Sequence, residues 1–261
     1  MHTVGVVGPG AAELVGRLVP ELDGRVATVE RVDEGRAEGP PAAAASYGLS
    51  PDGSWVGAGD GRTLEDLLDD LAPDHDHAVV ADFPDADLPA VALGDADPAG
   101  EVLLRAERPD AVDPGAVIDA LAGVEPRVTL ESLVRRVKES PGADRAGAIA
   151  TFTGRVRARD DGNDPRTLAL EFEKYEGVAD ERLATIREEL SARDGVQEVL
   201  LHHRTGVVAD GEDIVFVVVL AGHREEAFRT VEDGIDRLKA EVPLFKKEVT
   251  VEDEFWVHER P

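Results

Sequence analysis

Residues 213–248 read DIVFVVVLAGHREEAFRTVEDGIDRLKAEVPLFKKE, and this stretch decides the fold of the C-terminal half. It opens with a continuous β-branched run, which indicates a buried strand. Residues 224–241 follow with apolar side chains at helical spacing, namely Phe228, Val231, Ile235 and Leu238. Because Pro243 cannot continue a helix, the pattern predicts a buried strand followed by a helix with one apolar face.

The residues before this stretch predict the rest of an α+β domain. Residues 130–138 and 178–193 have the spacing of helices, and Gly195 is a suitable stop for the second. Residues 146–157 have the alternating character of a strand. A further strand is predicted at residues 168–173, with one buried face made by Leu168, Leu170 and Phe172.

The first 125 residues alternate apolar runs with amphipathic stretches, which predicts an α/β domain with a mostly parallel sheet. Strands are expected at residues 3–7, 25–29, 78–83 and 90–93, and helices at residues 12–22 and 64–71. GRAEGPPAAAAS, residues 35–46, is expected to be a surface loop. The break GVEPR, residues 123–127, predicts two domains, at residues 1–123 and 126–261.

Composition restricts the class of protein. The 261 residues, 42% of them hydrophobic, suffice for two domains that each bury a core. Without an eighteen-residue apolar run or the basic flank of a signal peptide, the chain is expected to be cytoplasmic and not membrane-bound. It has no cysteine, which excludes disulfides, thiolate metal sites and a persulfide carried on the protein.

The chain is strongly acidic, with 55 Asp and Glu against 28 Lys and Arg and a net charge of −27. This charge disfavours binding to nucleic acid and anionic membranes. It suits a very salty, halophilic cytoplasm, since the Debye length falls to about 3 Å at molar salt. Residues 1–125 carry 7 basic and 26 acidic side chains, whereas residues 126–261 carry 21 and 29. The basic side chains therefore concentrate in the second half.

Three basic clusters in the second half predict an anion-binding site. Arg155 and Arg157 are two apart on a strand, so both project to one face and can clamp an oxyanion. His223 and Arg224 lie where the buried strand ends and the long helix begins, a position that favours phosphate. The third cluster joins the end of this helix to the residues after Pro243 and contains Lys239, Lys246 and Lys247.

The lysines can face one pocket, because Lys239 lies near the helix end and Lys246 follows beyond Pro243. A lysine that is partly desolvated beside other cations loses its proton more readily, which suits a nucleophile or an acid–base catalyst. Spacing alone leaves alternatives open. The lysines can form a solvated face, the arginines can pair with carboxylates, and His223 can be a satisfied core histidine.

Five segments of the second half resemble, in order and spacing, the molybdopterin synthase large-subunit family: GAIATFTGRVR, LEFEKYEGVADERL, HHRTGVVADGEDIVFVVVLAGHREEAF, IDRLKAEVPLFKKE and FWVHER. The resemblance implies a hammerhead-like α+β fold and a homodimer. It implies a ubiquitin-like sulfur-carrier small subunit as partner, whose C-terminal Gly-Gly carries a thiocarboxylate. Sulfur transfer to cyclic pyranopterin monophosphate then gives the molybdopterin dithiolene, without a bound cofactor or metal.

The resemblance also implies roles for individual residues. Lys239 corresponds to the principal catalytic lysine and Lys246 to the second. Phe245 stands where the family more often has tryptophan and is expected to form an aromatic wall. The positions that correspond to substrate-binding residues are Arg155, Val156, Arg157, His223, Arg224, Lys247 and Glu248. The alternative is a non-catalytic, pterin-phosphate-binding scaffold or adaptor for cofactor enzymes.

The N-terminal segment MHTVGVVGPGAAELVGRLVPEL has the strand–turn–helix shape of a phosphate-binding loop, and its position resembles the molybdopterin-guanine dinucleotide adaptor family. Glu13, Leu14 and Val15 stand where that loop needs Gly, Lys and Ser or Thr. A degenerate P-loop-like domain without NTPase activity is therefore expected, the alternative being a nucleotidase that binds ATP or GTP.

Two histidine pairs are interpreted structurally. His75 and His77, in DHDHAVV, are expected to belong to an acidic loop that enters a strand and not to a metal site. His202 and His203 are expected to shape a strand and the dimer surface.

Overall fold

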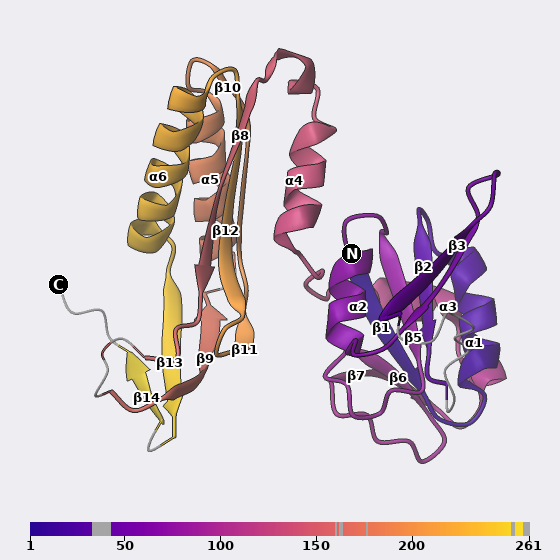
Figure 1. Cartoon of the computed structure of the whole chain (residues 1–261). Helices are drawn as coiled ribbons and strands as arrows, with labels where there is room; N and C mark the ends of the chain where they lie inside the picture. The colour runs from indigo at the N-terminus through magenta and orange to yellow at the C-terminus, as the bar shows by residue number, and fades with distance from the viewer. Residues whose placement is uncertain (33–42, 160, 162–163, 176, 252–253, 258–261) are drawn as a thin grey trace. The chain divides into compact units, whose positions relative to one another are not determined.

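The computed structural model describes residues 1–32, 43–159, 161, 164–175, 177–251 and 254–257 (Figure 1). Residues 258–260 of the segment FWVHER fall outside them. The chain divides into two compact units, Met1–Thr129 and Leu130–Pro261.

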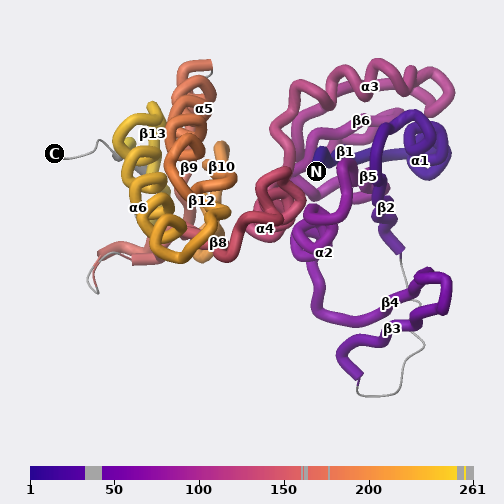
Figure 2. The backbone as a smooth tube through the Cα atoms, turned by 90° about the horizontal axis from the view of Figure 1, so that it is seen from above, coloured from indigo at the N-terminus to yellow at the C-terminus, as the bar shows by residue number. Residues whose placement is uncertain are grey.

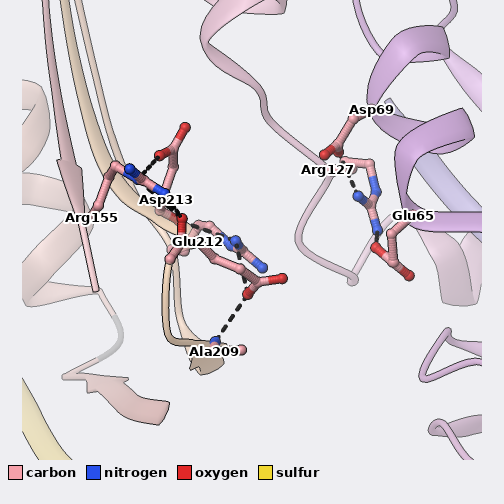
Figure 3. Close-up of polar contacts among 9 residues, drawn as sticks. Glu65, Asp69, Arg127, Arg155, Ala209, Glu212 and Asp213 are labelled. Carbon is pink, nitrogen blue, oxygen red and sulfur yellow. Dashed lines mark hydrogen bonds and ion pairs between the residues drawn. The ribbon is translucent and has the colours of Figure 1, made fainter. Parts of the chain in front are cut away.

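The division falls just after the GVEPR break, and Arg127 accounts for its position. The Arg127 guanidinium donates hydrogen bonds to Asp69, at 2.6 Å, and to Glu65, both on helix α2 (Leu64–Leu71) (Figure 3). Burial lowers the pKa of Arg127, but the hydrogen bonds and charges of the two carboxylates outweigh this effect and raise it. The residues up to Arg127 are thus tied to the first unit.

The first unit is built on a five-stranded sheet in the order β2-β5-β1-β6-β7. Each neighbouring pair is parallel, which confirms the predicted α/β domain with a parallel sheet. Leu14 and Leu18 of helix α1 pack on one face with helix α3, and Leu68 of α2 packs on the other. The bounds are β1 (His2–Val7), α1 (Ala11–Leu18), β2 (Val26–Glu30), β5 (His77–Ala81), β6 (Ala90–Leu93), β7 (Val102–Ala106) and α3 (Pro114–Leu121).

Three features of this unit were not predicted: β7, α3 and a hairpin of β3 (Ala45–Leu49) and β4 (Trp55–Gly59). Figure 2 shows the hairpin standing apart from the parallel sheet. Of the predicted loop at residues 35–46, residues 35–42 lie outside the described residues. The loop prediction is wrong at residues 45 and 46, which begin β3, because cross-strand pairing with β4 overrides their local composition.

The second unit has a three-stranded antiparallel sheet in the order β10-β12-β8, with helices on both faces. Figure 1 shows α5 and α6 on one face and α4 on the other. This arrangement confirms the predicted α+β domain. The bounds are α4 (Leu130–Lys138), β8 (Ala148–Arg155), α5 (Val178–Ser191), β10 (Val196–His203), β12 (Asp213–Ala221) and α6 (Arg224–Glu241).

Strand β12 is the centre of this unit, and its residues from 214 to 221 are all buried. Val215, Val217 and Val219 pack against a core shared with α5 and α6, to which Leu190 and Ile235 contribute. A Cβ on Gly234 of α6 would lie 3.0 Å from Cγ1 of Val217, so the helix approaches the sheet closely.

The apolar face of α6 is rotated from the predicted one. Val231, Ile235 and Leu238 are buried as expected, but Phe228 is 66% exposed. The buried face is completed by small residues, Ala227, Thr230 and Gly234, which allow the close approach to β12. At 100° per residue this displaces Phe228 to the margin of the face.

A four-stranded sheet, in the order β11-β9-β13-β14, forms the other end of the second unit (Figure 1). Leu170 and Phe172 are buried as predicted, but Leu168 is exposed. The register explains this, because Val249 pairs with Ala169 whereas Thr250 pairs with Thr167, leaving Leu168 as an extra residue. The bounds are β9 (Thr167–Lys174), β11 (Gly206–Ala209), β13 (Leu244–Thr250) and β14 (Glu254–Val257).

No helix within the described part of the chain is both long enough and apolar enough to cross a membrane.

The rotated face of α6 generates a paired stability prediction. Leu190→Ala removes a fully buried side chain from the core between α5, α6 and β12, and should cost about 2–5 kcal/mol of unfolding free energy. Phe228→Ala changes an exposed position and should alter stability by no more than about 0.5 kcal/mol. Urea unfolding followed by far-ultraviolet circular dichroism measures both. A comparable loss in the two variants would contradict the burial assigned to α6.

Candidate active site

A pocket of about 510 Å³ lies in the second unit, among the ends of β8 and α6 and the strands β9 and β13. Its volume is typical of a small-molecule site. Part of its wall is apolar and aromatic, with Phe152, Leu170, Phe172, Ile214 and Leu244. The charged side chains that line it are Arg155, Arg157, Lys239, Lys246 and Glu248.

The end of α6 and the start of β13 bring the two lysines together. The helix ends at Glu241, because Val242 is extended and Pro243 has no N–H to continue it. Lys239 lies in the last turn, with its Nζ 5.8 Å from the centroid of the Phe152 ring, a cation–π distance. Lys246 lies on β13, beyond the turn.

Neither Lys239 nor Lys246 has a carboxylate of a described residue within ion-pair distance. This is informative in a chain with 55 acidic and 28 basic side chains, where a cation finds a carboxylate easily. Two ammonium groups that face one pocket, with no carboxylate of a described residue in ion-pair reach, favour an anion supplied from outside.

The two arginines line the pocket at the end of β8. Both are exposed, and Val156 between them is buried. β8 ends at Arg155, so Arg157 lies just beyond the strand on which it was predicted. The Nε of Arg155 donates to the carbonyl oxygen of Gly211, at 3.0 Å, and lies 3.5 Å from a carboxylate oxygen of Asp213 (Figure 3). Arg155 is therefore partly neutralised, which was one of the alternatives for this pair.

Val156 does not line the pocket. Its side chain packs in an apolar cluster with Leu170 and Phe172. Its backbone N–H donates to Glu212 and its carbonyl accepts from Gly211, both at 2.9 Å. Val156, predicted to bind substrate, therefore packs against residues of the pocket wall and does not itself line the pocket.

Alternation along β13 sorts its side chains between two faces. Lys246 and Glu248 face the pocket, whereas Lys247 lies on the other face, where its Nζ is 3.7 Å from a carboxylate oxygen of Glu171. Phe245 shares the face of Lys247 and is 52% exposed. The expected aromatic wall at Phe245 is therefore wrong, because its strand position directs it away from the pocket.

His223 and Arg224 lie at the opposite end of α6 from Lys239. Both are exposed at the N-terminus of the helix, and the His223 side chain makes no capping hydrogen bond. At 1.5 Å per residue, α6 separates Arg224 from Lys239 by about 22 Å. A single copy of the chain therefore does not bring this pair to the pocket.

His203 lines the pocket and was missed as a site residue, since it was expected to shape a strand and the dimer surface. Its Nδ1 lies 2.7 Å from the carbonyl oxygen of Arg204, and its ring packs edge-on against Phe172. His202 points to the other face of β10 and stacks on Phe216. Alternation places the two histidines on opposite faces, but the sequence carries no signal that tells which face meets the pocket.

The turn after β1 does not offer an open phosphate nest. The Gly8 N–H donates to a carboxylate oxygen of Asp82, at 3.4 Å, so an acidic group occupies the position that a phosphate would need. Glu13 is exposed in the first turn of α1, and Leu14 is buried.

The histidines of DHDHAVV have separate partners. His75 Nδ1 lies 3.0 Å from the carbonyl oxygen of Leu71, whereas the ring of His77 stacks on that of His2. Within the described ranges, no three or more His, Asp or Glu side chains are grouped so that they could hold a metal ion.

A pocket lined by apolar, aromatic and basic side chains, in which two lysines have no carboxylate of a described residue within ion-pair distance, is typical of an α+β enzyme domain that acts on an anionic small molecule. The comparisons with known proteins identify the family. A family profile described as MoaE protein matches residues 125–241. The "Probable molybdopterin synthase" of Haloferax volcanii is 59% identical over 262 residues, which cover 100% of both chains. The chain belongs to the molybdopterin synthase family, whose members act in molybdenum cofactor biosynthesis.

Other relatives match about half of the chain. The molybdopterin synthase catalytic subunit of Yersinia pestis is 40% identical over 117 residues, 45% of this chain and 76% of that one. The crystal structure of molybdopterin synthase from Staphylococcus aureus has a TM-score of 0.45 and 31% identity, and covers 52% of this chain and 94% of that one.

The two faces of β13 generate a prediction about anion binding. Lys246→Ala should weaken the binding of inorganic phosphate about tenfold, because it removes a charge-assisted contact from the pocket. Lys247→Ala is the matched control on the other face and should change affinity by no more than about twofold. Isothermal titration calorimetry measures both. An equal loss in the two variants would show that phosphate does not bind in the pocket.

Proposed function

We propose that this chain transfers sulfur from a thiocarboxylated, ubiquitin-like carrier protein to cyclic pyranopterin monophosphate, giving the molybdopterin dithiolene. The observation that carries the proposal is the pocket in which Lys239 and Lys246, from different elements, face one space with Arg157. The second unit then corresponds to the hammerhead-like large subunit of molybdopterin synthases.

The chemistry of the pocket supports this substrate. A planar pterin ring suits the apolar and aromatic wall, and the phosphate suits the basic side chains that line the pocket. The thiocarboxylate at the carrier terminus is also an anion, so the same positive charge attracts the sulfur donor to an otherwise acidic protein. Because the chain has no cysteine, the sulfur has to arrive on a partner.

Lys239 is proposed as the central catalytic residue and Lys246 as the second. Lys239 lies over Phe152 at the pocket wall, with no carboxylate of a described residue within ion-pair distance. A lysine in such a setting can act as a nucleophile or exchange protons with the substrate. Arg157 and Arg155 then hold the phosphate end of the substrate.

His223 and Arg224 are proposed to act from a second copy of the chain in a homodimer. They are exposed at a helix N-terminus, a favourable position for an anion, but lie about 22 Å of helix away from Lys239 of the same chain. An isologous dimer would let each copy complete the pocket of the other.

The first unit is proposed to be a degenerate relative of P-loop adaptor domains. Its strand, glycine turn and helix keep the shape of that motif, while residues 1–125 have no lysine and Asp82 occupies the turn. Its strongly acidic surface is proposed to be an adaptation to concentrated salt.

Lys239→Ala should lower the rate of dithiolene formation by a factor of about 10² or more, because the catalytic group is lost. Lys138→Ala, at an exposed position of α4, is the matched control and should retain wild-type turnover. Mass spectrometry of a reaction with thiocarboxylated carrier and cyclic pyranopterin monophosphate measures the product. Wild-type turnover in Lys239→Ala would refute its catalytic role, and an inactive wild-type chain would favour a non-catalytic scaffold that binds pterin phosphate.

Mixing inactive variants tests the shared site. If His223 serves the pocket of the other copy, His223→Ala and Lys239→Ala subunits exchanged in equal amounts should regain about a quarter of wild-type activity, since half of the dimers have one intact site. Each variant alone should remain inactive. Activity that stays at the level of the single variants, with subunit exchange verified by native mass spectrometry, would place all site residues in one copy.

A further inference from the structure

Thr167 is a buried polar side chain in the wall of the pocket, and no role follows for it from the resemblance. It is 5% exposed, whereas the following residue, Leu168, is 44% exposed. Burial of a hydroxyl without a partner is costly, so the partner of Thr167 indicates what the position is for.

The register shift in β9 creates this position. Ala169 pairs with Val249 and Thr167 pairs with Thr250, so Leu168 is the extra residue of a bulge. In a regular strand, Leu168 would share the pocket face with Leu170 and Phe172. The bulge turns Leu168 outward and brings the Thr167 hydroxyl to the pocket in its place.

Thr167 is bonded on two sides to the site. Its Oγ1 donates a hydrogen bond to Oε1 of Glu248 on β13. Its backbone N–H donates to the carbonyl oxygen of Ala158, at 2.9 Å, directly after Arg157. The residue therefore links the arginine segment to the only carboxylate among the described residues that line the pocket.

Glu248 and Lys246 are two residues apart on the same face of β13, within easy reach of an ion pair for such long side chains. Among the described residues no such pair is formed, and the Glu248 carboxylate is bonded to Thr167 instead. The hydroxyl thus competes with the ammonium group for the carboxylate.

We propose that Thr167 is a positioning residue that holds the Glu248 carboxylate away from Lys246, so that the Lys246 ammonium stays available to the anionic substrate. This inference rests on the proposed function, because it assigns a role to Thr167 in the same pocket. Without the hydroxyl, the carboxylate is expected to turn to Lys246, which lies two residues away on the same face of β13. Arg155 is already held by Gly211 and Asp213.

The test uses the full chain and the reactivity of each lysine. Trace acetylation with acetic anhydride, read by peptide mass spectrometry, reports how readily an amine gives up its proton, and a paired ammonium does so less readily. In Thr167→Val, labelling of Lys246 should fall about two- to tenfold. Labelling of Lys138, which is exposed on α4, should not change and serves as the internal reference.

Three further arms make the result specific. Thr167→Ser keeps the hydroxyl and should keep wild-type labelling of Lys246. Thr167→Val combined with Glu248→Gln removes the competing charge and should restore the labelling. The remaining charged or titratable side chains that face the pocket are Arg155, Arg157, His203 and Lys239, so labelling of Lys239 in the same digest shows whether the effect is confined to Lys246. Unchanged Lys246 labelling in Thr167→Val, or a loss that Glu248→Gln does not restore, would overturn the proposal.

Dithiolene formation measured in parallel separates this inference from the proposed function. Thr167→Val should lower the turnover rate while circular dichroism shows a folded chain, and Thr167→Ser should restore it. If the wild-type chain forms no dithiolene, the proposed function fails, yet the labelling of Lys246 still decides whether Thr167 holds Glu248.

Discussion

Burial of strand β12 on both faces is the constraint on which the second unit depends. Residues 214–221 have no polar side chain, so α5 and α6 must cover one face and α4 the other. β12 runs into α6 through His223, and α6 leads the chain back along the sheet to the end where β12 begins. Pro243 follows the end of the helix there. The pocket lies at that end, where α6 and β8 end and their last side chains are no longer packed in the core.

The pocket is lined by several basic side chains, although the chain as a whole is strongly acidic. Carboxylates outnumber basic groups by almost two to one, and Arg155, Lys174 and Lys247 each have a carboxylate partner. Lys239 and Lys246 differ, with no carboxylate of a described residue in reach. Keeping two ammonium groups apart from so many acids requires rigid placement, which the end of α6 and the hydrogen-bonded strand β13 provide.

The features that made the strand and helix predictions partly wrong also shape the site. The bulge at Leu168 broke the expected alternation in β9 and brought Thr167 to Glu248. The small residues of α6 displaced Phe228 from the buried face and allowed the helix to approach β12. Local patterns assume a regular element, and such departures from regularity depend on the partner strand or sheet.

The sequence by itself determined the element types from residues 213 to 241, the parallel sheet of the first half, and the gathering of lysines around Pro243, because burial patterns and proline geometry are local properties. It also carried the resemblance that identified the family. Only the tertiary structure decided that Lys246 faces the pocket while Lys247 does not, that His203 joins the site, and that His223 lies a helix length from Lys239. These facts depend on register and on which face of a strand meets its neighbours, and hydrogen bonding between distant segments sets both.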